Sequence, residues 1–551
     1  MKHILLITIS MFFFTLHTNA QNVEWATRAG GGGEDVILKM VNDDVGNLYV
    51  LGYNSPSAQF SNLNVANEGQ FFAKVDTNGN YLFVVQFDSS IISSMSINNA
   101  NQILITGATT GTDVSGTPVN FVSSGMSVGF AVLYDTSGTQ LWMTPLDHYG
   151  FFNSPTNTFG TEFIISGCVP PNAVIGSFTF SNQEPQNYLA SINSSGVITN
   201  AELIATSTSA QVPLIVADTT GNIYVTGSYF YNVTFSNGQT LTPNFGTEGY
   251  YILKCDPAFN VVWSIHGQGF SEDNYFGGVR VMSVLSNQNL VVAGEFIDST
   301  HFGNDTIINY SANNYTTFAI SIDPNANVQW ISLSDVYRTS MIKSFDSTGF
   351  YLAGISEHDS SFSIGGIPFT VSPNHVAMYL VKFNNSGNAL WGRSFETVHM
   401  GGSCCESIRD FVKGNSDEIY FAGHYYIEAI FDTITLPCYM NSGLCGPYEA
   451  FVAKLGNIPT GIQSMYVPDA YVKIYPNPTN GWLQIELSNS KSSKSIVTVT
   501  DLLGQQIIQS SFSKSQFEID LTEMKDGVYF VQIENDGNVF REKVVKVKGG
   551  E

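Results

Sequence analysis

Charged side chains are scarce in this sequence: Asp, Glu, Lys and Arg supply only 12% of its 551 residues, about half of their usual share in soluble proteins. Long amphipathic helical patterns are also missing. Apolar residues make up 43%, which is enough for a sizeable core. Gly, Ser, Asn, Thr, Tyr and Phe take the place of the charges, and this mixture favours short strands and turns. We therefore expect an all-β protein.

Cations are scarcer than anions, and unevenly so. Residues 21–456 hold 12 Lys and Arg against 35 Asp and Glu, a net charge of −23. Residues 469–551 hold 9 against 11, a net charge of −2. An acidic body of this kind repels nucleic acid and anionic lipid, so we predict no nucleic-acid partner. Solubility alone explains the charge, and cation binding is the alternative.

Several motifs that carry chemistry are absent, among them the Asp-x-Asp-x-Asp-Gly calcium loop, the His-Glu-x-x-His zinc motif and the Gly-rich phosphate loop. We assign no catalytic residue, no cofactor-binding residue and no metal ligand. Stretches such as Asp76–Gly79 invite a calcium interpretation. They are better explained as β-turns in which Asp accepts a local hydrogen bond and Gly adopts a positive φ. Calcium is the one cofactor that stays open.

The N-terminus has the pattern of a secretory signal peptide. Lys2 and His3 precede a mostly apolar stretch from Ile4 to Leu16, and small residues end at Ala20. We assign residues 1–20 to the signal peptide, with cleavage after Ala20. A membrane anchor is the alternative, but the stretch is short for a bilayer. No other stretch is long and apolar enough, so we predict no transmembrane segment.

An internal repeat dominates residues 21–456. Asp44–Gly52 and Asp218–Gly227 each contain a Gly-Asn turn, an alternating apolar strand and a closing Gly. Counterparts of the closing Gly recur at steps of 55 to 69 residues, which gives seven units: Gly52, Gly107, Gly167, Gly227, Gly294, Gly354 and Gly423. Self-similarity at such a period indicates a repeat architecture.

Each unit supplies four strands, and in the first unit we place them near Val36–Val41, Leu48–Gly52, Phe71–Val75 and Tyr81–Gln86. Four-stranded units repeated radially make a β-propeller. The last unit ends after its third strand, Ala450–Leu455, and the chain begins with an unmatched fourth strand, Val23–Thr27. We expect this N-terminal strand to complete the last blade and to protect its edge. An open stack of repeats is the alternative.

At these residues the chain resembles a known repeat. Gly-Asn-x-Tyr-Val-x-Gly, then Phe-x-Ala-Lys-x-Asp, then Trp, is similar to the SBBP-type β-propeller repeat of secreted bacterial proteins. The resemblance covers roughly Val23 to Leu455, and three of the units are degenerate. It implies a seven-bladed propeller and says little about function.

A second pattern starts after a linker at residues 457–471. Short alternating strands over residues 472–551 indicate a small, Ig-like β-sandwich. The motifs there resemble the type A sorting domain of the type IX secretion system. The residues that carry this resemblance are Tyr475, Pro476, Asn477, Pro478, Asp501, Gly504, Gly527, Val528, Tyr529, Lys546 and Lys548. It implies that the type IX machinery is a partner and that the protein is secreted or attached to the outer cell surface. A carbohydrate-binding or spacer sandwich is the alternative.

The propeller topology places the long connections of all units on one face, and function tends to lie on long loops. Ionisable residues of that face come from several units: Arg28, Glu34, Asp35, Asp147, His148, Glu272, Asp273, Asp335, Arg338, Glu396 and His399. Carboxylates with a His could serve a hydrolase. Scattered solvated charge is the simpler interpretation.

All six cysteines lie in the repeat region. Cys168 and Cys255 fall on strands, where we expect lone buried thiols. Cys404, Cys405, Cys438 and Cys445 lie in two loops of the last unit that open on one face. Because the exported compartment is oxidising, we predict at least one disulfide between the 404/405 pair and the 438/445 pair. Zinc held by these thiols is the alternative.

Two function classes remain. The first is a secreted or cell-surface binding protein, an adhesin or a glycan or protein binder. The second is a secreted hydrolase or lyase that acts on polysaccharide or protein. We favour the first, because no catalytic spacing stands out.

Overall fold

The computed structural model describes residues 22–547 with interruptions. The residues outside the described part are 1–21, 88–89, 111–112, 115–116, 119–127, 147–155, 207–213, 230, 244–248, 271–277, 297–298, 303–304, 309–315, 335–337, 357–361, 399–406, 439, 442–443, 446–447, 457–471, 478, 488–494, 501–505, 515, 536–537 and 548–551. The described residues form strands and turns and contain no helix. The protein is therefore all-β, as the composition predicts.

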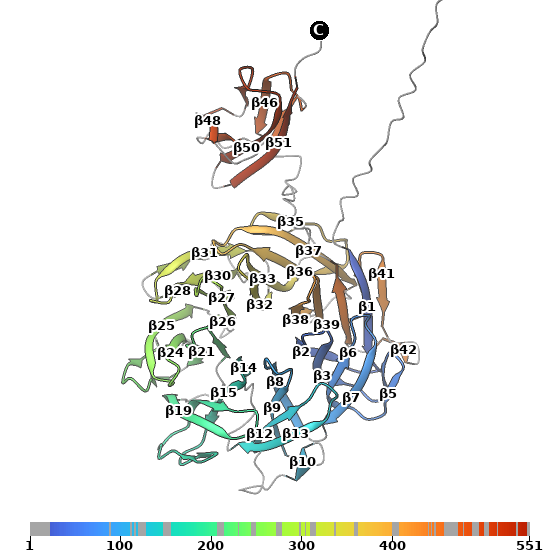
Figure 1. The fold of residues 1–551 in the computed structure, drawn as a ribbon, viewed down its shortest axis with the longest axis vertical. Coiled ribbons are helices and arrows are strands. Elements are labelled where there is room, and N and C mark those ends of the chain that lie inside the picture. Colours follow the sequence, from blue (N-terminus) through green and yellow to red (C-terminus); the bar gives the residue numbers. More distant parts are fainter. Residues whose placement is uncertain are drawn as a thin grey trace, which may run out of the picture.

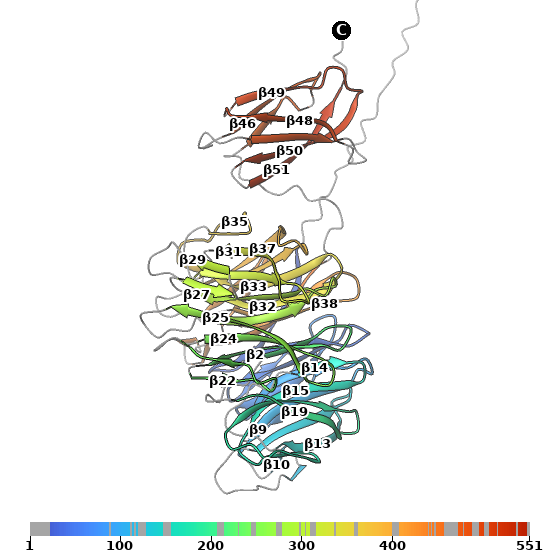
Figure 2. The same cartoon turned by 90° about the vertical axis from the view of Figure 1, so that its left-hand side faces the viewer.

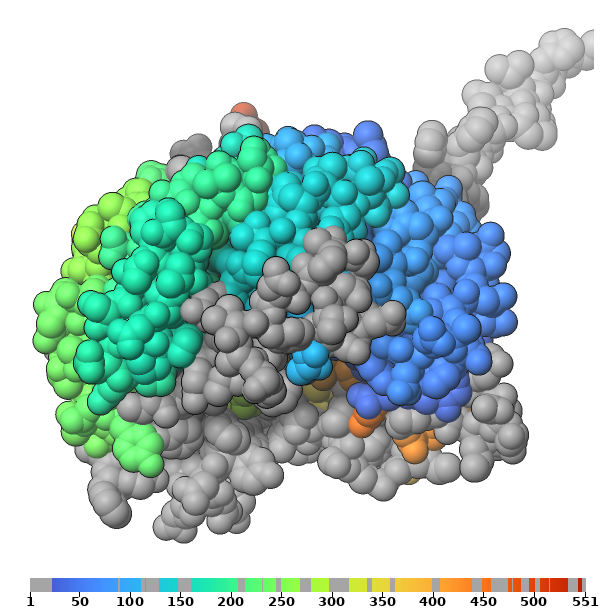
Figure 3. Space-filling view, turned by 90° about the horizontal axis from the view of Figure 1, so that it is seen from below, coloured from blue at the N-terminus to red at the C-terminus, as the bar shows by residue number. Residues whose placement is uncertain are grey.

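Antiparallel sheets are arranged radially around a common axis (Figure 1). In the rim view, the sheets coloured blue to green follow one another (Figure 3). The strand orders, from the centre outwards, are β2-β3-β6-β7, β8-β9-β12-β13, β14-β15-β18-β19, β20-β21-β24-β25, β26-β27-β30-β31, β32-β33-β36-β37 and β38-β39-β44-β1. Each order forms one unit, and we number the units 1 to 7 in this sequence. Such an arrangement is propeller-like.

The first, innermost strands of the units are β2 (Val36–Asn42), β8 (Ser90–Ile97), β14 (Thr156–Phe159), β20 (Leu214–Ala217), β26 (Gly278–Val284), β32 (Arg338–Asp346) and β38 (Ser407–Lys413). The second strands are β3 (Leu48–Asn54), β9 (Ile103–Thr109), β15 (Glu162–Val169), β21 (Ile223–Tyr229), β27 (Leu290–Phe296), β33 (Gly349–Ser356) and β39 (Ile419–Tyr425). The third are β6 (Gly69–Val75), β12 (Val128–Tyr134), β18 (Gln186–Ile192), β24 (Gly249–Cys255), β30 (Thr316–Ile322), β36 (His375–Phe383) and β44 (Glu449–Leu455). The outermost are β7 (Tyr81–Phe87), β13 (Gln140–Leu146), β19 (Ile198–Thr206), β25 (Val261–Phe270), β31 (Val328–Ser334), β37 (Ala389–Val398) and β1 (Val23–Gly30).

The N-terminal strand joins the last unit. β1 pairs antiparallel with β44, and its register sets Val23 opposite Leu455 and Trp25 opposite Lys454. Gly456 donates its N–H to the carbonyl of Asn22 at 3.0 Å. This pairing confirms the predicted docking of the N-terminal strand, and it covers an edge of β44 that would otherwise be open.

The core lies between neighbouring sheets. Leu51 and Phe72 of unit 1 share one buried cluster with Ile105 and Val132 of unit 2. Because both faces of a sheet are covered, central strands such as β27 are buried at every residue. The repeat keeps its closing Gly because a neighbouring strand approaches the backbone closely at this position. At Gly52, an added Cβ would lie 2.1 Å from the carbonyl oxygen of Val36.

A second contact links several units to the next. The indole N–H of Trp25 donates to the carbonyl of Thr77, and that of Trp330 donates to Asn385, both at 3.0 Å. Each ring also lies against the turn Gly of that neighbouring unit, Gly79 and Gly387. The repeat therefore keeps a Trp and a turn Gly because they meet across the boundary between units.

Trp391 departs from this rule. Its indole nitrogen is buried and has no hydrogen-bond partner in the described structure. The next unit is built from both ends of the repeat region, so β44 and β1 are not joined by the tight turn that supplies the acceptor elsewhere. The unsatisfied N–H lies beside the unit whose outer strand comes from the other end of the repeat region.

The long connections between second and third strands contain hairpins, which the sequence analysis missed. They are β4 (Ala58–Phe60) with β5 (Leu63–Val65), β10 (Asp113–Val114) with β11 (Thr117–Pro118), β16 (Val174–Ile175) with β17 (Phe178–Thr179), β22 (Val233–Thr234) with β23 (Thr240–Leu241), β28 (Ser299–Phe302) with β29 (Asp305–Ile308), β34 (Phe362–Ile364) with β35 (Ile367–Phe369), β40 (Glu428–Phe431) with β41 (Ile434–Pro437), and β42 (Met440–Asn441) with β43 (Leu444–Cys445). Three of them pair with the outer strand of the preceding unit: β4 with β1, β28 with β25 and β40 with β37. These connections therefore also brace neighbouring units.

The C-terminal part forms two further sheets, which Figure 2 shows one above the other. One has the order β45-β46-β49 and the other β48-β47-β50-β51. Their buried residues, including Leu483, Ile485, Val499 and Val531, belong to one cluster. The strands are β45 (Val472–Tyr475), β46 (Trp482–Leu487), β47 (Ser495–Thr500), β48 (Gln506–Phe512), β49 (Gln516–Asp520), β50 (Gly527–Asn535) and β51 (Asn538–Lys546).

Among the residues that the structure describes, no helix has the length and hydrophobicity needed to cross a lipid bilayer.

Candidate functional site

The sorting-motif residues meet at one end of the C-terminal sheets. The backbone N–H of Val545 donates to the Asn477 side-chain oxygen at 2.9 Å. Lys546 is buried, and its Nζ lies 3.2 Å from Asp526 Oδ1. The Tyr529 hydroxyl donates to the carbonyl of Lys525 at 2.7 Å. The structure thus brings the Tyr-Pro-Asn segment against the last strand, β51.

Other residues of this motif are distributed differently. Tyr475 is exposed and its hydroxyl donates to Glu486. Gly527 and Val528 begin β50. Pro478, Asp501, Gly504 and Lys548 lie outside the described residues, as does the cleavage position Ala20. The role of the motif as a recognition signal stays a prediction.

Asp35 was a candidate on the long-connection face, and the structure gives it a local role. Its carboxylate is buried and accepts hydrogen bonds from the N–H of Gly31 at 2.9 Å and from the N–H of Ser55 at 2.7 Å. The Ser55 hydroxyl adds a third donor at 3.0 Å. Burial, the largest effect, raises the pKa of Asp35, and these hydrogen bonds oppose it. Asp35 therefore holds two connections together.

Glu396 has a similar task in unit 6, where it accepts hydrogen bonds from the N–H and the hydroxyl of Ser372 at 2.9 and 3.1 Å. Asp35 and Glu396 thus belong to separate local networks. Six other candidates of this face lie outside the described residues, and only the backbone of a seventh, Arg338, is described; the six are Asp147, His148, Glu272, Asp273, Asp335 and His399.

A compact group of side chains lies on the same face in unit 7, at the ends of strands β39, β44 and β1. We call it the seam cluster: Arg28, His424, Tyr426, Tyr448 and Glu449. Arg28 Nε lies 4.0 Å from the buried Glu449 carboxylate. The Tyr448 ring lies 5.2 Å from the His424 ring and 6.2 Å from the Tyr426 ring, centre to centre.

The two tyrosines of the seam cluster are partly exposed, and the Arg28 side chain is 26% exposed. Glu34 lies beside them through a backbone bridge to Tyr448. Sequence analysis identified Arg28 and Glu34 but missed His424 and Glu449. Their burial depends on which strand ends meet at the junction, and a single sequence does not show this.

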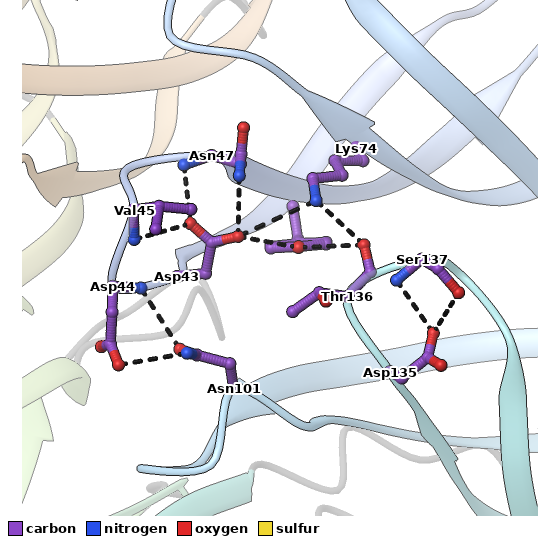
Figure 4. A network of polar contacts seen from close by, with 10 residues as sticks. Asp43, Asp44, Val45, Asn47, Lys74, Asn101, Asp135, Thr136 and Ser137 are labelled. Carbon is purple, nitrogen blue, oxygen red and sulfur yellow. Dashed lines mark hydrogen bonds and ion pairs between the residues drawn. The ribbon is translucent and has the colours of Figure 1, made fainter.

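On the opposite face, tight turns contain carboxylates whose oxygens accept several local hydrogen bonds. Asp43 accepts hydrogen bonds from the backbone of Val45 and Asn47, and Lys74 Nζ lies 3.9 Å away (Figure 4). In the next turn of the same unit, Asp76 accepts from the N–H of Asn80 at 2.8 Å, and Gly79 has a φ of 87°. This geometry confirms the β-turn interpretation of the Asp-x-x-Gly stretches.

The described part of the chain shows no group of three His, Cys, Asp or Glu side chains that could hold a metal ion.

One motif escaped the sequence analysis. Gly125, Ser127 and Gly129 have the Gly-x-Ser-x-Gly spacing of a nucleophile elbow, which places its Ser between a strand and a helix. Residues 125–127 lie outside the described part, but Val128 and Gly129 open strand β12. A strand follows this Ser where the elbow requires a helix, so the motif carries no catalytic assignment.

Two cysteine predictions have different outcomes. Cys168 and Cys255 are buried thiols that form no disulfide, as expected. Burial raises the pKa of the Cys255 thiol to about 12, so it is unreactive at neutral pH. Cys438 is buried and is not among the free cysteines of the described residues, which are Cys168 and Cys255. Cys404 and Cys405 lie outside the described residues, and only the backbone of Cys445 is described.

Comparison with known families identifies the C-terminal part. Residues 473–548 match the secretion system C-terminal sorting domain. No curated protein matches the chain.

Solved structures with a similar arrangement are propeller-like but remote. The Dos1 propeller is 7% identical, with a TM-score of 0.35, and the match covers 79% of this chain and 96% of that one. PorZ, a surface component of the type IX secretion system of Porphyromonas gingivalis, is 12% identical, with a TM-score of 0.25 and coverage of 94% and 75%. The endosialidase of phage phi92 is 10% identical, with a TM-score of 0.36 and coverage of 96% and 88%. Likenesses at this level carry no argument about function.

The sorting domain does support a statement about location. It implies engagement with the type IX secretion system, and the protein is therefore secreted or displayed on the outer cell surface.

Proposed function

We propose that the protein is a seven-bladed β-propeller of the SBBP type, closed by its N-terminal strand, that binds an extracellular glycan or protein ligand. Residues 1–20 would be its signal peptide, 21–456 the propeller, 457–471 a linker and 472–551 an Ig-like sorting sandwich. The seven four-stranded units and the β1–β44 pairing support this organisation.

The seam cluster is the observation that carries the binding role. Tyr426 and Tyr448 are partly exposed, and Tyr448 directly precedes Glu449, whose carboxylate lies 4.0 Å from Arg28 Nε. Tyr and Arg are the residue types that dominate binding energy at protein surfaces, and aromatic rings also stack on sugars. The acidic candidates Asp35 and Glu396 are engaged by neighbouring loop groups, which leaves them poorly placed to act as a general acid or base.

A binding screen tests the proposal directly. The mature protein is applied to a glycan array and to a panel of extracellular proteins, with a parallel assay for polysaccharide and protein cleavage. Tyr426→Ala should weaken binding of the best ligand about tenfold, as expected for a hot-spot residue.

Tyr231→Ala is the matched control, because Tyr231 is a 68% exposed tyrosine of unit 4, and it should leave binding unchanged. Equal losses in both variants would contradict a site at the seam. Turnover of a polysaccharide or protein would instead support the alternative, a secreted hydrolase or lyase.

Export has its own test. Truncation before Val472 should leave a folded propeller in the periplasm, and fusion of residues 457–551 to a foreign periplasmic protein should carry that protein outside the cell. Normal secretion of the truncated chain would overturn the sorting role that the family match implies.

A further inference from the structure

The scarce cations of the propeller gather on its innermost strands. Residues 21–456 contain 12 Lys and Arg. Six of these lie on β26, β32, β38 and β2: Arg280, Arg338, Lys343, Arg409, Lys413 and Lys39. The same four strands hold two carboxylates, Asp346 and Asp410. The innermost strands of units 2 to 4, β8, β14 and β20, hold no charged residue.

We call these four strands the axial wall. They belong to units 5, 6, 7 and 1, which follow one another around the ring, and Figure 1 shows them side by side at its centre. The wall has six cations and two carboxylates, within a body whose net charge is −23. Its sign is therefore opposite to that of the rest of the propeller.

Two arginines occupy equivalent places on this wall. Arg280 and Arg409 each sit at a β-bulge, directly after the residue that faces the closing Gly of their unit. A bulge turns a side chain away from the regular pleat. Both side chains are exposed, Arg280 by 48%, although its Nε also lies 4.0 Å from Glu295.

Two lysines share the buried Asp410. Lys343 Nζ lies 2.5 Å from Asp410 Oδ1, and the backbone N–H of Met40 donates to Oδ2 at 2.9 Å. Lys39, the residue before Met40, is partly buried, and the charges of Asp410 and Lys343 both act on it. Among the described residues, none accepts a hydrogen bond from its ammonium or lies within ion-pair distance of it.

One carboxylate thus serves two ammonium groups. Burial, the largest effect, lowers the pKa of Lys39, and the charge of Lys343 acts in the same direction, while Asp410 opposes both. A partly buried cation without its own counter-ion is unfavourable. An anion beside Lys39 would supply the missing acceptors.

We propose that the axial wall binds an oxyanion, such as phosphate, sulfate or the carboxylate of an acidic sugar, with Lys39 among its donors. The inference goes beyond the proposed function, because binding of a free inorganic anion would stand even if no glycan or protein ligand were found.

The test is calorimetric titration of the mature protein with sodium phosphate, sodium sulfate and galacturonate at constant ionic strength, with chloride as the reference anion. Lys39→Met should weaken oxyanion binding at least tenfold. Lys454→Met is the matched control, since Lys454 is ion-paired with Glu24 at 2.7 Å on the outer part of unit 7, and it should change affinity less than twofold.

Heat of binding no larger than that of chloride for all three anions would overturn the proposal, and so would equal losses in the two lysine variants. If Lys39→Met does not fold, Lys39→Gln replaces it, because a polar amide removes the charge without adding an apolar end, and it should weaken binding at least threefold. Unchanged affinity in Lys39→Gln would then refute the site. Tighter binding of oligogalacturonate than of galacturonate would support an acidic glycan as the source of the oxyanion, and equal affinity would support a free anion.

Discussion

The contact between a turn glycine and the tryptophan of the preceding unit can be measured at Gly387. This residue has a φ of 80°, and a Cβ added there would lie 2.7 Å from the Trp330 ring. Gly366 in the same unit has a φ of 84° and no heavy atom within 4 Å of the added Cβ. Alanine at either position meets the same backbone strain, but only Gly387→Ala meets a ring.

The difference between the two variants isolates the packing against Trp330. Left-handed backbone costs an L-residue about 1–2 kcal/mol, so Gly366→Ala should lower the free energy of unfolding by that amount. Gly387→Ala should add about 1–3 kcal/mol for overpacking, which gives a total of about 2–5 kcal/mol.

Guanidinium unfolding of the mature chain, followed by tryptophan fluorescence, gives both values. In a Trp330→Ala background the excess cost of Gly387→Ala should disappear, because the added Cβ then meets open space. Equal destabilisation by the two glycine variants in the native background would refute the packing argument.

Three further predictions follow from single residues. Trp25→Ala should lower the free energy of unfolding by about 2–4 kcal/mol, because the Trp25 ring is only partly buried. Glu24→Ala, which removes an exposed ion pair, should lower it by at most about 1 kcal/mol. An unchanged melting temperature of Trp25→Ala would mean that β1 does not dock in solution. Cys438 should be recovered by non-reducing peptide mapping in a disulfide with Cys404 or Cys405, with a contribution of roughly 3–4 kcal/mol, and four thiols in unit 7 of the exported protein would contradict this. Burial raises the pKa of Asp346, but hydrogen bonds from Lys413 and Thr348 outweigh it and lower the pKa from 3.8 to about 2. The ionised carboxylate therefore stabilises the fold above pH 3.8, and this contribution is lost as the pH falls towards 2. Asp346→Asn should accordingly reduce the fall in melting temperature at acid pH, when thermal unfolding is measured against pH.

The strands and turns of the repeat could be predicted from the sequence because their signals are local. Asp76 and Gly79 fix a turn within four residues, and the flanking strands β6 and β7 carry apolar residues at their buried positions. In the first unit, β2, β3, β6 and β7 lie where the sequence places them, with ends that differ by one or two residues.

The hairpins of the long connections were missed for the opposite reason. β4 pairs with β1, whose residues are about 30 positions earlier, and that partner cannot be inferred from β4 itself. A local signal was present nonetheless: Ile364 and Ile367 flank Gly365 and Gly366, which is the pattern of a two-residue hairpin turn.

Candidate sites were harder to predict than the fold because they arise where units differ. Glu449 opens β44 and is buried, although Gly69 and Gly249 open the corresponding strands β6 and β24. Neither its burial nor its approach to Arg28 follows from the repeat. Sequence analysis therefore found the partly exposed Arg28 and the exposed Glu34 and missed the buried His424 and Glu449.

The lysines of the propeller fall into two groups, one that belongs to the repeat and one that does not. Four lysines lie over tyrosine rings at equivalent register positions, in the pairs Lys74–Tyr49, Lys254–Tyr224, Lys382–Tyr351 and Lys454–Tyr420, at 5.2 to 5.7 Å from the ring centres. These pairs explain why the repeat contains both a Tyr and a Lys, since cross-strand neighbours in the second and third strands meet in each case. Lys39 and Lys343 belong to no such pair, and they lie on first strands of units 1 and 6 at positions that the other units do not share. Lys343 is ion-paired with the buried Asp410 and lies over the Phe411 ring, so its charge serves the scaffold. Lys39 has no hydrogen-bond or ion-pair partner among the described residues, and the proposed oxyanion would supply one.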